Sequence, residues 1–134
     1  MTNVVPVNMG IWCETGRQQF QIEANMGTSI SHLVGRNSEV ESLPVICLDD
    51  FSAIANFPKV DFVKMDIEGA ELQVLESAEN FVTKYRPRFI IEPHYIKGQL
   101  LTDKICQIMT KYGYTCFLIE QAGLPMPLIY CEPK

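Results

Sequence analysis

Two short stretches of the sequence hold the side chains best suited to chemistry. The first contains Lys64, Asp66 and Glu68, and the second contains Glu92 and His94. Carboxylates and imidazoles exchange protons near neutral pH, because the unperturbed pKa of histidine is about 6.5. These five residues are therefore our candidates for general acid–base catalysis or for binding a charged ligand.

The first stretch ends an apolar run of strand length. Alternation along a strand puts Lys64 and Asp66 on one face, with Glu68 just beyond them in the turn. Charged side chains within an apolar strand are costly unless they are paired or used. Two interpretations stay open: the acids favour the start of the next helix while Lys64 neutralises Asp66, or all three belong to a site.

The second stretch follows another predicted strand. Pro93 cannot donate to a sheet ladder, so it marks the strand end and leaves Glu92 and His94 at the carboxyl tip. Neighbouring parallel strands lie about 4.8 Å apart, so Asp66 and Glu92 could face one cleft, where His94 would accept a proton. A hydrogen-bonded surface histidine is the alternative. Asp, Glu and His also permit a divalent metal ion, but their spacing is not specific and we predict no metal site.

These two stretches need elements that bring strand ends together. From residue 60 onward, short apolar runs alternate with helical periodicity. This alternation indicates parallel strands joined by right-handed crossovers, so it predicts an α/β fold. Arg86-Pro87 should close the first helix and Gly113 the second. The predicted strands are 60–67, 88–92, 114–120 and an antiparallel 126–131, and the predicted helices are 72–85 and 101–112.

The N-terminal part follows a different pattern. Strands at 4–12 and 18–22 are predicted to form a hairpin around a glycine-containing loop. The segment 26–41 is rich in Gly, Ser and Asn and predicts a long loop. The remaining predicted elements are a strand at 43–48 and a short helix at 50–56 that Asp49 caps.

Length, composition and charge limit the classes of protein. The 134 residues are 47% hydrophobic and 20% charged, which predicts one folded domain over 1–134, with a β-rich segment at 1–59 and a βαβαββ core at 60–134. A net charge of −5 with scattered basic residues disfavours binding to nucleic acid or to an anionic membrane. Five cysteines without a C-x-x-C pair, and no run of about 18 apolar residues, predict a cytoplasmic protein.

The motif K-M-D-I-E-G-A-E at 64–71 is the most specific feature of the sequence. Together with Leu48-Asp49 before it and with Arg86-Pro87 and Glu92 after it, this motif resembles the FkbM-type S-adenosylmethionine-dependent methyltransferases. The resemblance implies a class I methyltransferase fold, which is a seven-stranded Rossmann-like sheet with helices on both faces. It also implies S-adenosylmethionine as cofactor and methylation of a hydroxyl group on a small molecule or sugar.

Site roles follow from the same resemblance. Asp66 and Glu68 match acidic positions after the family's fourth strand, and Glu92 and His94 match those after the fifth. These four residues are therefore expected to be catalytic, with Lys64 and Asp66 on the cofactor side. The proton of the acceptor hydroxyl would pass to Asp66 or His94.

The cofactor motifs of the family are missing from the sequence. No two of the eight glycines are separated by a single residue, so a G-x-G turn is absent. The resemblance begins at the family's third strand, so we expect the C-terminal portion of the domain, truncated by two strand–helix units. Such a portion could be inactive alone. The alternatives are a non-catalytic interaction or oligomerisation domain, and a metal-dependent hydrolase that uses Asp66, Glu92 and His94.

Truncation would also leave one strand without a neighbour. In the family's sheet the first strand lies beside the fourth, so the strand at 62–67 would have an unpaired apolar edge. Such edges recruit partners. Either the strand that begins at Val4 pairs with this edge, or two copies of the chain associate there as a homo-oligomer.

Overall fold

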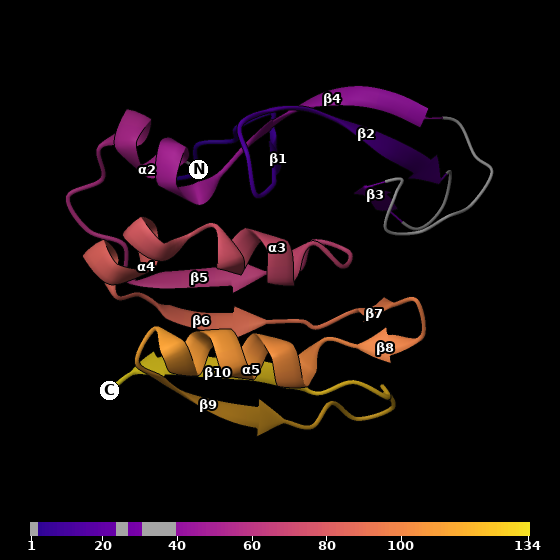
Figure 1. Cartoon of the computed structure of the whole chain (residues 1–134), viewed down its shortest axis with the longest axis vertical. Helices are drawn as coiled ribbons and strands as arrows, with labels where there is room; N and C mark the ends of the chain where they lie inside the picture. Colours follow the sequence, from indigo (N-terminus) through magenta and orange to yellow (C-terminus); the bar gives the residue numbers. More distant parts are fainter. Residues whose placement is uncertain (1–2, 24–26, 31–39) are drawn as a thin grey trace.

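The strands of this computed structural model, which describes residues 3–23, 27–30 and 40–134, form two four-stranded sheets and one two-stranded ribbon (Figure 1). Across the first sheet the strands are β1 (Gly10–Ile11), β4 (Val40–Ile46), β2 (Gly16–Glu23) and β3 (Gly27–Ile30). Across the second sheet they are β5 (Phe62–Met65), β6 (Arg88–Ile91), β10 (Leu128–Pro133) and β9 (Tyr114–Ile119). The ribbon pairs β7 (Tyr95–Ile96) with β8 (Gln99–Leu100).

The second sheet has the predicted α/β character. β5 and β6 are parallel, with Met65 opposite Ile91, while β10 lies antiparallel between β6 and β9. The antiparallel C-terminal strand is therefore confirmed. Because β5 and β6 point the same way, their carboxyl ends meet at one edge of the sheet, which is where the candidate residues follow.

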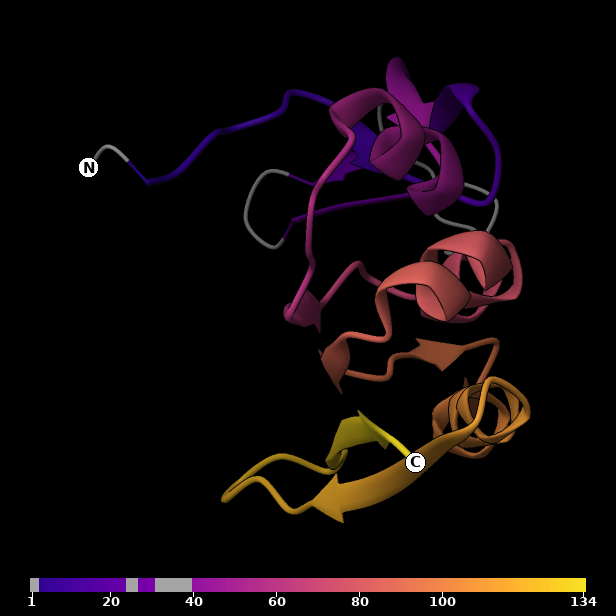
Figure 2. The same ribbon diagram turned by 90° about the vertical axis from the view of Figure 1, so that its left-hand side faces the viewer.

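Three helices cover the second sheet. They are α3 (Glu71–Glu76), α4 (Glu79–Tyr85) and α5 (Thr102–Lys111). Figure 2 shows all three on the same face of that sheet, whereas the family resemblance implied helices on both faces. Arg86 closes α4 in a left-handed conformation, and Gly113 after α5 has a φ of 78°, so both predicted helix ends are confirmed.

The predicted single helix over 72–85 is divided into α3 and α4. Ser77 ends α3, because its hydroxyl donates to the carbonyl of Val74 at 3.0 Å and its amide turns back to the same oxygen. The start of α4 is then capped from a distance: one Asp49 oxygen accepts from the amide of Phe81 at 2.7 Å. The expectation that Asp49 caps its own helix was wrong. Cys47 is the N-cap of α2 (Leu48–Ala55), through its sulfur.

The N-terminal strand differs most from the expectation. Only Gly10–Ile11 of the predicted strand 4–12 is a strand, and it pairs parallel with β4 rather than in a hairpin with β2. Pro6 cannot donate to a ladder, and Val5 is 85% exposed, so within the described part of the chain this segment has no sheet neighbour. The predicted strand 43–48 corresponds to β4. Of the predicted loop 26–41, residues 27–30 form β3, and residues 26 and 31–39 lie outside the described residues.

The edge of β5 is open in the described part of the chain. β5 pairs only with β6 there, and the side chain of Phe62 is 49% exposed. The strand that begins at Val4 does not cover this edge, because it pairs with β4 instead. That alternative was therefore wrong, and association of two copies stays a prediction.

One hydrophobic core joins the second sheet to its helices. Phe89 of β6 is fully buried and meets the ring of Tyr114 edge-on at 5.7 Å between centroids. Burying each such side chain contributes about 1.5–3 kcal/mol. Trp12 and Val45 from the N-terminal part belong to the same core, so the N-terminal part packs against this half of the chain. No helix among the described residues is long and apolar enough to cross a membrane.

Candidate functional site

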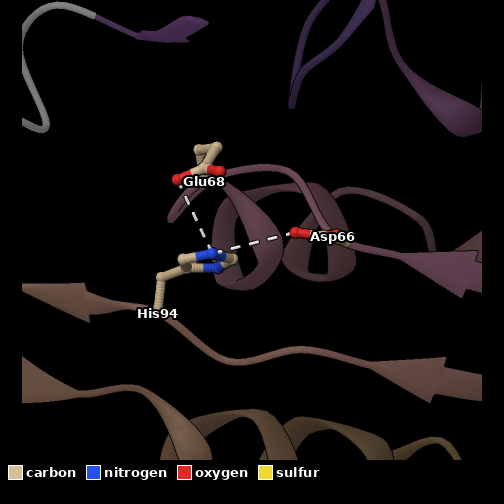
Figure 3. Close-up of side chains that lie close together, drawn as sticks. All are labelled: Asp66, Glu68 and His94. Atoms are coloured by element: carbon tan, nitrogen blue, oxygen red, sulfur yellow. Dashed lines mark ion pairs between the residues drawn. The ribbon is translucent and has the colours of Figure 1, made fainter. Parts of the chain in front are cut away.

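The carboxyl ends of β5 and β6 bring three of the predicted residues together. Asp66 and Glu68 follow β5, and His94 follows β6 (Figure 3). The Nε2 atom of His94 lies 3.8 Å from Asp66 Oδ1 and 3.6 Å from Glu68 Oε2. The expectation that these side chains converge at the strand ends is thus met in the geometry.

A strained turn after β5 positions the carboxylates of Asp66 and Glu68. Glu68 has a φ of 55° and Gly69 a φ of 97°, so two successive residues adopt left-handed conformations between β5 and α3. A Cβ at Gly69 would overlap the Cδ1 atom of Ile96 in β7, so the end of that side chain would have to move. Glycine is therefore favoured here chiefly by the backbone conformation, which side chains rarely adopt.

Glu71 lies beneath this turn and was not among the predicted site residues. Its side chain is fully buried, and its Oε1 atom accepts from the amides of Ile67 and Gly69 at 3.2 Å each. The same oxygen lies 2.9 Å from Nδ1 of His94. One carboxylate oxygen thus connects the end of β5 to the loop after β6. We call Asp66, Glu68, Glu71 and His94 the acid–imidazole cluster.

The surroundings of His94 favour its protonated form. The hydrogen bond to Glu71 raises the pKa of His94 above its ordinary value of 6.5, and the negative charges of Glu71, Glu68 and Asp66 act in the same direction. Partial burial of the ring opposes this shift, because it disfavours the charged imidazolium. The side chain is only 17% exposed, so solvent screens these interactions weakly.

Lys64 and Asp66 form the ion pair that the sequence suggested. Lys64 Nζ lies 3.0 Å from Asp66 Oδ2, while the other oxygen of Asp66 faces His94. The two interpretations of this stretch are therefore compatible, since one carboxylate serves both contacts. The pair is exposed, so its own contribution to stability is small, about 0–1 kcal/mol.

Glu92 is not part of the cluster. Its backbone amide continues the ladder by donating to the carbonyl of Met65 at 2.9 Å, and its side chain is half-buried. Within the described residues its carboxylate makes no hydrogen bond or ion pair. The further acid that contacts His94 is Glu71 and not Glu92. A signal for Glu71 was present: it shares an apolar helix face with Leu75 and Ala78, where an acid needs a buried partner.

The cluster can hold a positive charge. One atom each from Asp66, Glu68 and His94 lies within 4.8 Å of the others, a spacing that a proton on the imidazole or a small cation could share. Both outer carboxylates are exposed, and exposed acids are common in proteins without any ion. The contact with Glu71 favours a proton on the ring as the positive charge that the cluster holds.

Comparison with known proteins places the chain. The model of the methyltransferase FkbM domain matches residues 10–116, which include the whole acid–imidazole cluster. The crystal structure of methyltransferase FkbM from Methylobacillus flagellatus KT is similar with a TM-score of 0.49 and 25% identity, over 67% of this chain and 23% of that one. The chain therefore spans about a quarter of that protein's length. No curated protein matches. Because the domain model covers most of its residues, the chain belongs to the FkbM methyltransferase domain family.

Proposed function

We propose that the acid–imidazole cluster is the methyl-transfer site of an S-adenosylmethionine-dependent methyltransferase that acts on a hydroxyl group of a small molecule or sugar. The observation that carries the proposal is the position of His94 Nε2, less than 4 Å from Asp66 and Glu68 at the ends of two parallel strands. Ligands of open parallel sheets bind beyond these ends. Family membership supplies the class of reaction.

The sheet order supports a class I, Rossmann-like assignment. The second sheet runs β5-β6-β10-β9, with one antiparallel strand inserted beside parallel ones. We propose that these are the fourth, fifth, seventh and sixth strands of the family's sheet. On this assignment residues 60–134 are the βαβαββ part of one methyltransferase domain, and residues 1–59 are its β-rich segment.

The residues present fit one end of the cofactor. S-adenosylmethionine, when bound, supplies an electrophilic methyl group on a sulfonium, and it also carries a cationic ammonium group. The exposed carboxylates of Asp66 and Glu68 complement such charges, and Lys64 serves the cofactor side by holding Asp66 in place. The sequence has no G-x-G turn, so we assign the adenosine to no residue.

His94 is the proposed proton acceptor. When the acceptor hydroxyl is methylated, Nε2 of the neutral ring would take the hydroxyl proton, and Asp66 and Glu68 would stabilise the imidazolium that forms. Alignment of the hydroxyl with the methyl group supplies much of the acceleration. The neutral ring, which is the reactive form, becomes more abundant as the pH increases through the pKa of His94. Because this pKa is raised, the increase occurs above the range expected for an ordinary histidine.

The hydrolase alternative has lost one of its residues. It required Glu92 beside Asp66 and His94, whereas the carboxylate that contacts His94 from below is Glu71. We keep Glu92 as a proposed site residue only for methyl acceptors that are long enough to reach beyond the cluster. Nothing in the described residues favours a non-catalytic interaction domain over a methyltransferase.

The test is transfer of a tritiated methyl group from S-adenosylmethionine to a panel of methyl glycosides and small alcohols, by the natural protein that carries this chain. Asp66→Asn and His94→Ala should each lower turnover, the histidine change by about 10²–10⁴-fold. Asp61→Asn is the matched control, because Asp61 lies at the opposite end of β5 and is 61% exposed. Wild-type rates in both cluster variants, or no transfer to any hydroxyl, would contradict the proposal.

Two further expectations belong to this proposal. The open edge of β5 supports association of two copies, which sedimentation at increasing concentration should detect as a dimer; a monomer at every concentration would contradict it.

The five free cysteines support a cytoplasmic location, where thiols stay reduced.

A further inference from the structure

Glu71 has the most unusual environment of any acid in the described residues. Its side chain is 0% exposed, and the other buried polar side chains there are the neutral Ser52 and Thr102. Burying a carboxylate is costly unless it is paired and hydrogen-bonded. One of its oxygens has three partners, and the other, Oε2, has none among the described residues. The side chain is thus held by a single oxygen.

The partners of that oxygen determine where the protons lie. The backbone amides of Ile67 and Gly69 can only donate, so Oε1 accepts from both. Because Oε1 already accepts from two amides, it acts as an acceptor toward His94 as well, so the 2.9 Å contact requires the hydrogen on Nδ1. The neutral ring then carries its lone pair on Nε2, the atom that faces Asp66 and Glu68.

We propose that Glu71 is a positioning residue for methyl transfer: it holds neutral His94 in the Nδ1–H tautomer, with the accepting nitrogen directed at the reaction site. The inference rests on the proposed function, since it explains how His94 becomes competent as the acceptor. The same oxygen fixes the Gly69 turn, so the acids beside Nε2 and the ring itself are positioned by one side chain.

The charge of Glu71 has a second effect. The groups that face His94 are Glu71 from α3 and Asp66 and Glu68 from the turn, with Lys64 acting on it through Asp66. β7, which packs over the turn, contributes the apolar Ile96. Glu71 makes the only contact below 3 Å among these carboxylates. Removing its charge should therefore make neutral His94 available at lower pH, even while it weakens catalysis.

Glu71→Gln separates these effects from a loss of fold. Glutamine has the same shape, and its carbonyl oxygen can still accept from the Ile67 and Gly69 amides. In the methyl-transfer assay we expect a lower maximal kcat, little change in KM, and an acid limb of the pH–rate profile moved to lower pH. Glu71→Asp keeps the charge but is one methylene short, so it should lower kcat without moving the limb downward. Glu79→Gln, in the first turn of α4 and exposed, is the matched control.

Nitrogen-15 NMR of the His94 ring in this chain tests the inference without any activity. In the wild type, at a pH where the ring is neutral, we expect the proton on Nδ1; in Glu71→Gln we expect a lower His94 pKa and a smaller Nδ1–H population. A wild-type ring protonated on Nε2 overturns the inference, and so does a folded Glu71→Gln protein with an unchanged pKa and tautomer. These NMR results leave the methyl-transfer proposal standing, whereas wild-type turnover in His94→Ala overturns that proposal without altering the NMR.

Discussion

The second sheet holds two groups of titratable side chains whose pKa values are raised for different reasons. Around β5 and β6, the Glu71 carboxylate raises the pKa of His94. Around α5, β9 and β10, burial raises the pKa of Cys106 to about 12 and also raises the pKa of Cys131. We call these two residues, together with Cys116 beside Cys131, the thiol cluster.

The same direction of shift has opposite chemical consequences. Raising the pKa of a thiol removes the reactive thiolate at neutral pH, so the thiol cluster behaves as part of the core. The sulfurs of Cys116 and Cys131 pack 3.1 Å apart on paired strands without a disulfide. Raising the pKa of an imidazole moves its proton exchange toward and above neutral pH, where a catalyst can use it. The cause of a pKa shift therefore distinguishes a residue of a functional site from a residue of the core better than the direction of the shift does.

The largest expected effect separates the two clusters by turnover. His94→Gln should lower methyl transfer by about 10²–10⁴-fold, because the proton acceptor is lost. Cys131→Ser should leave turnover unchanged, since the thiol cluster touches no part of the proposed site. The measurement is the tritiated-methyl assay with both variants side by side. A loss of turnover in Cys131→Ser, after allowing for unfolded protein, would erase the distinction.

The next effect separates them by stability. Cys131 is fully buried on β10, so a serine hydroxyl there would have only the weakly accepting sulfur of Cys116 beside it, and Cys131→Ser should lower the free energy of unfolding by about 1–3 kcal/mol. Asp66→Asn changes an exposed side chain and should stay within about 0.5 kcal/mol. Urea denaturation followed by circular dichroism provides both values. The comparison fails if the two variants are equally destabilised.

The pH dependence of stability should show each cluster in its own range. A group whose folded pKa is raised contributes stability below its unfolded pKa, and this stability is lost as the pH rises through the folded value. For His94 the loss begins above pH 6.5 and amounts to about 1.4 kcal/mol for each unit of pKa shift. For the thiols it begins above pH 9.0. Denaturation midpoints from pH 6 to 10 should therefore fall in two steps, and Glu71→Gln should reduce only the first.

The smallest effect concerns the exposed ion pair. Lys64→Gln should change the free energy of unfolding by less than about 1 kcal/mol, because solvent screens the contact with Asp66. Loss of this positive charge should nevertheless raise the pKa of His94 slightly, which proton NMR can measure. A fall in that pKa would show that Lys64 does not act on the ring through Asp66.

Much of the second sheet was predictable because local signals and long-range packing agree there. Short apolar runs of strand length indicated β5 and β6, and Pro93 placed His94 at a strand end. Parallel pairing then brought Asp66, Glu68 and His94 together, as the sequence predicted. Glu71 was missed because an acid in the first turn of a helix usually interacts with the helix dipole, and only tertiary packing buries this one.

The errors lie where distant residues override local patterns. The helix over 72–85 looked continuous, but Ser77 and the Asp49 carboxylate divide it. β1 was expected to form a hairpin with β2, but β4 lies between these two strands. Neither partner can be read from nearby sequence, because Asp49 and β4 each lie about thirty residues away along the chain. The family resemblance helped most where its motif residues also form the site.

The most direct test of the account compares two numbers: the pKa of His94 measured by NMR and the pH at which methyl transfer reaches half its maximal rate. If neutral His94 is the proton acceptor, the two values coincide, both lie above 6.5, and both fall together in Glu71→Gln. A rate that stays constant through the pH range in which His94 titrates would contradict the assignment of the acid–imidazole cluster as the methyl-transfer site.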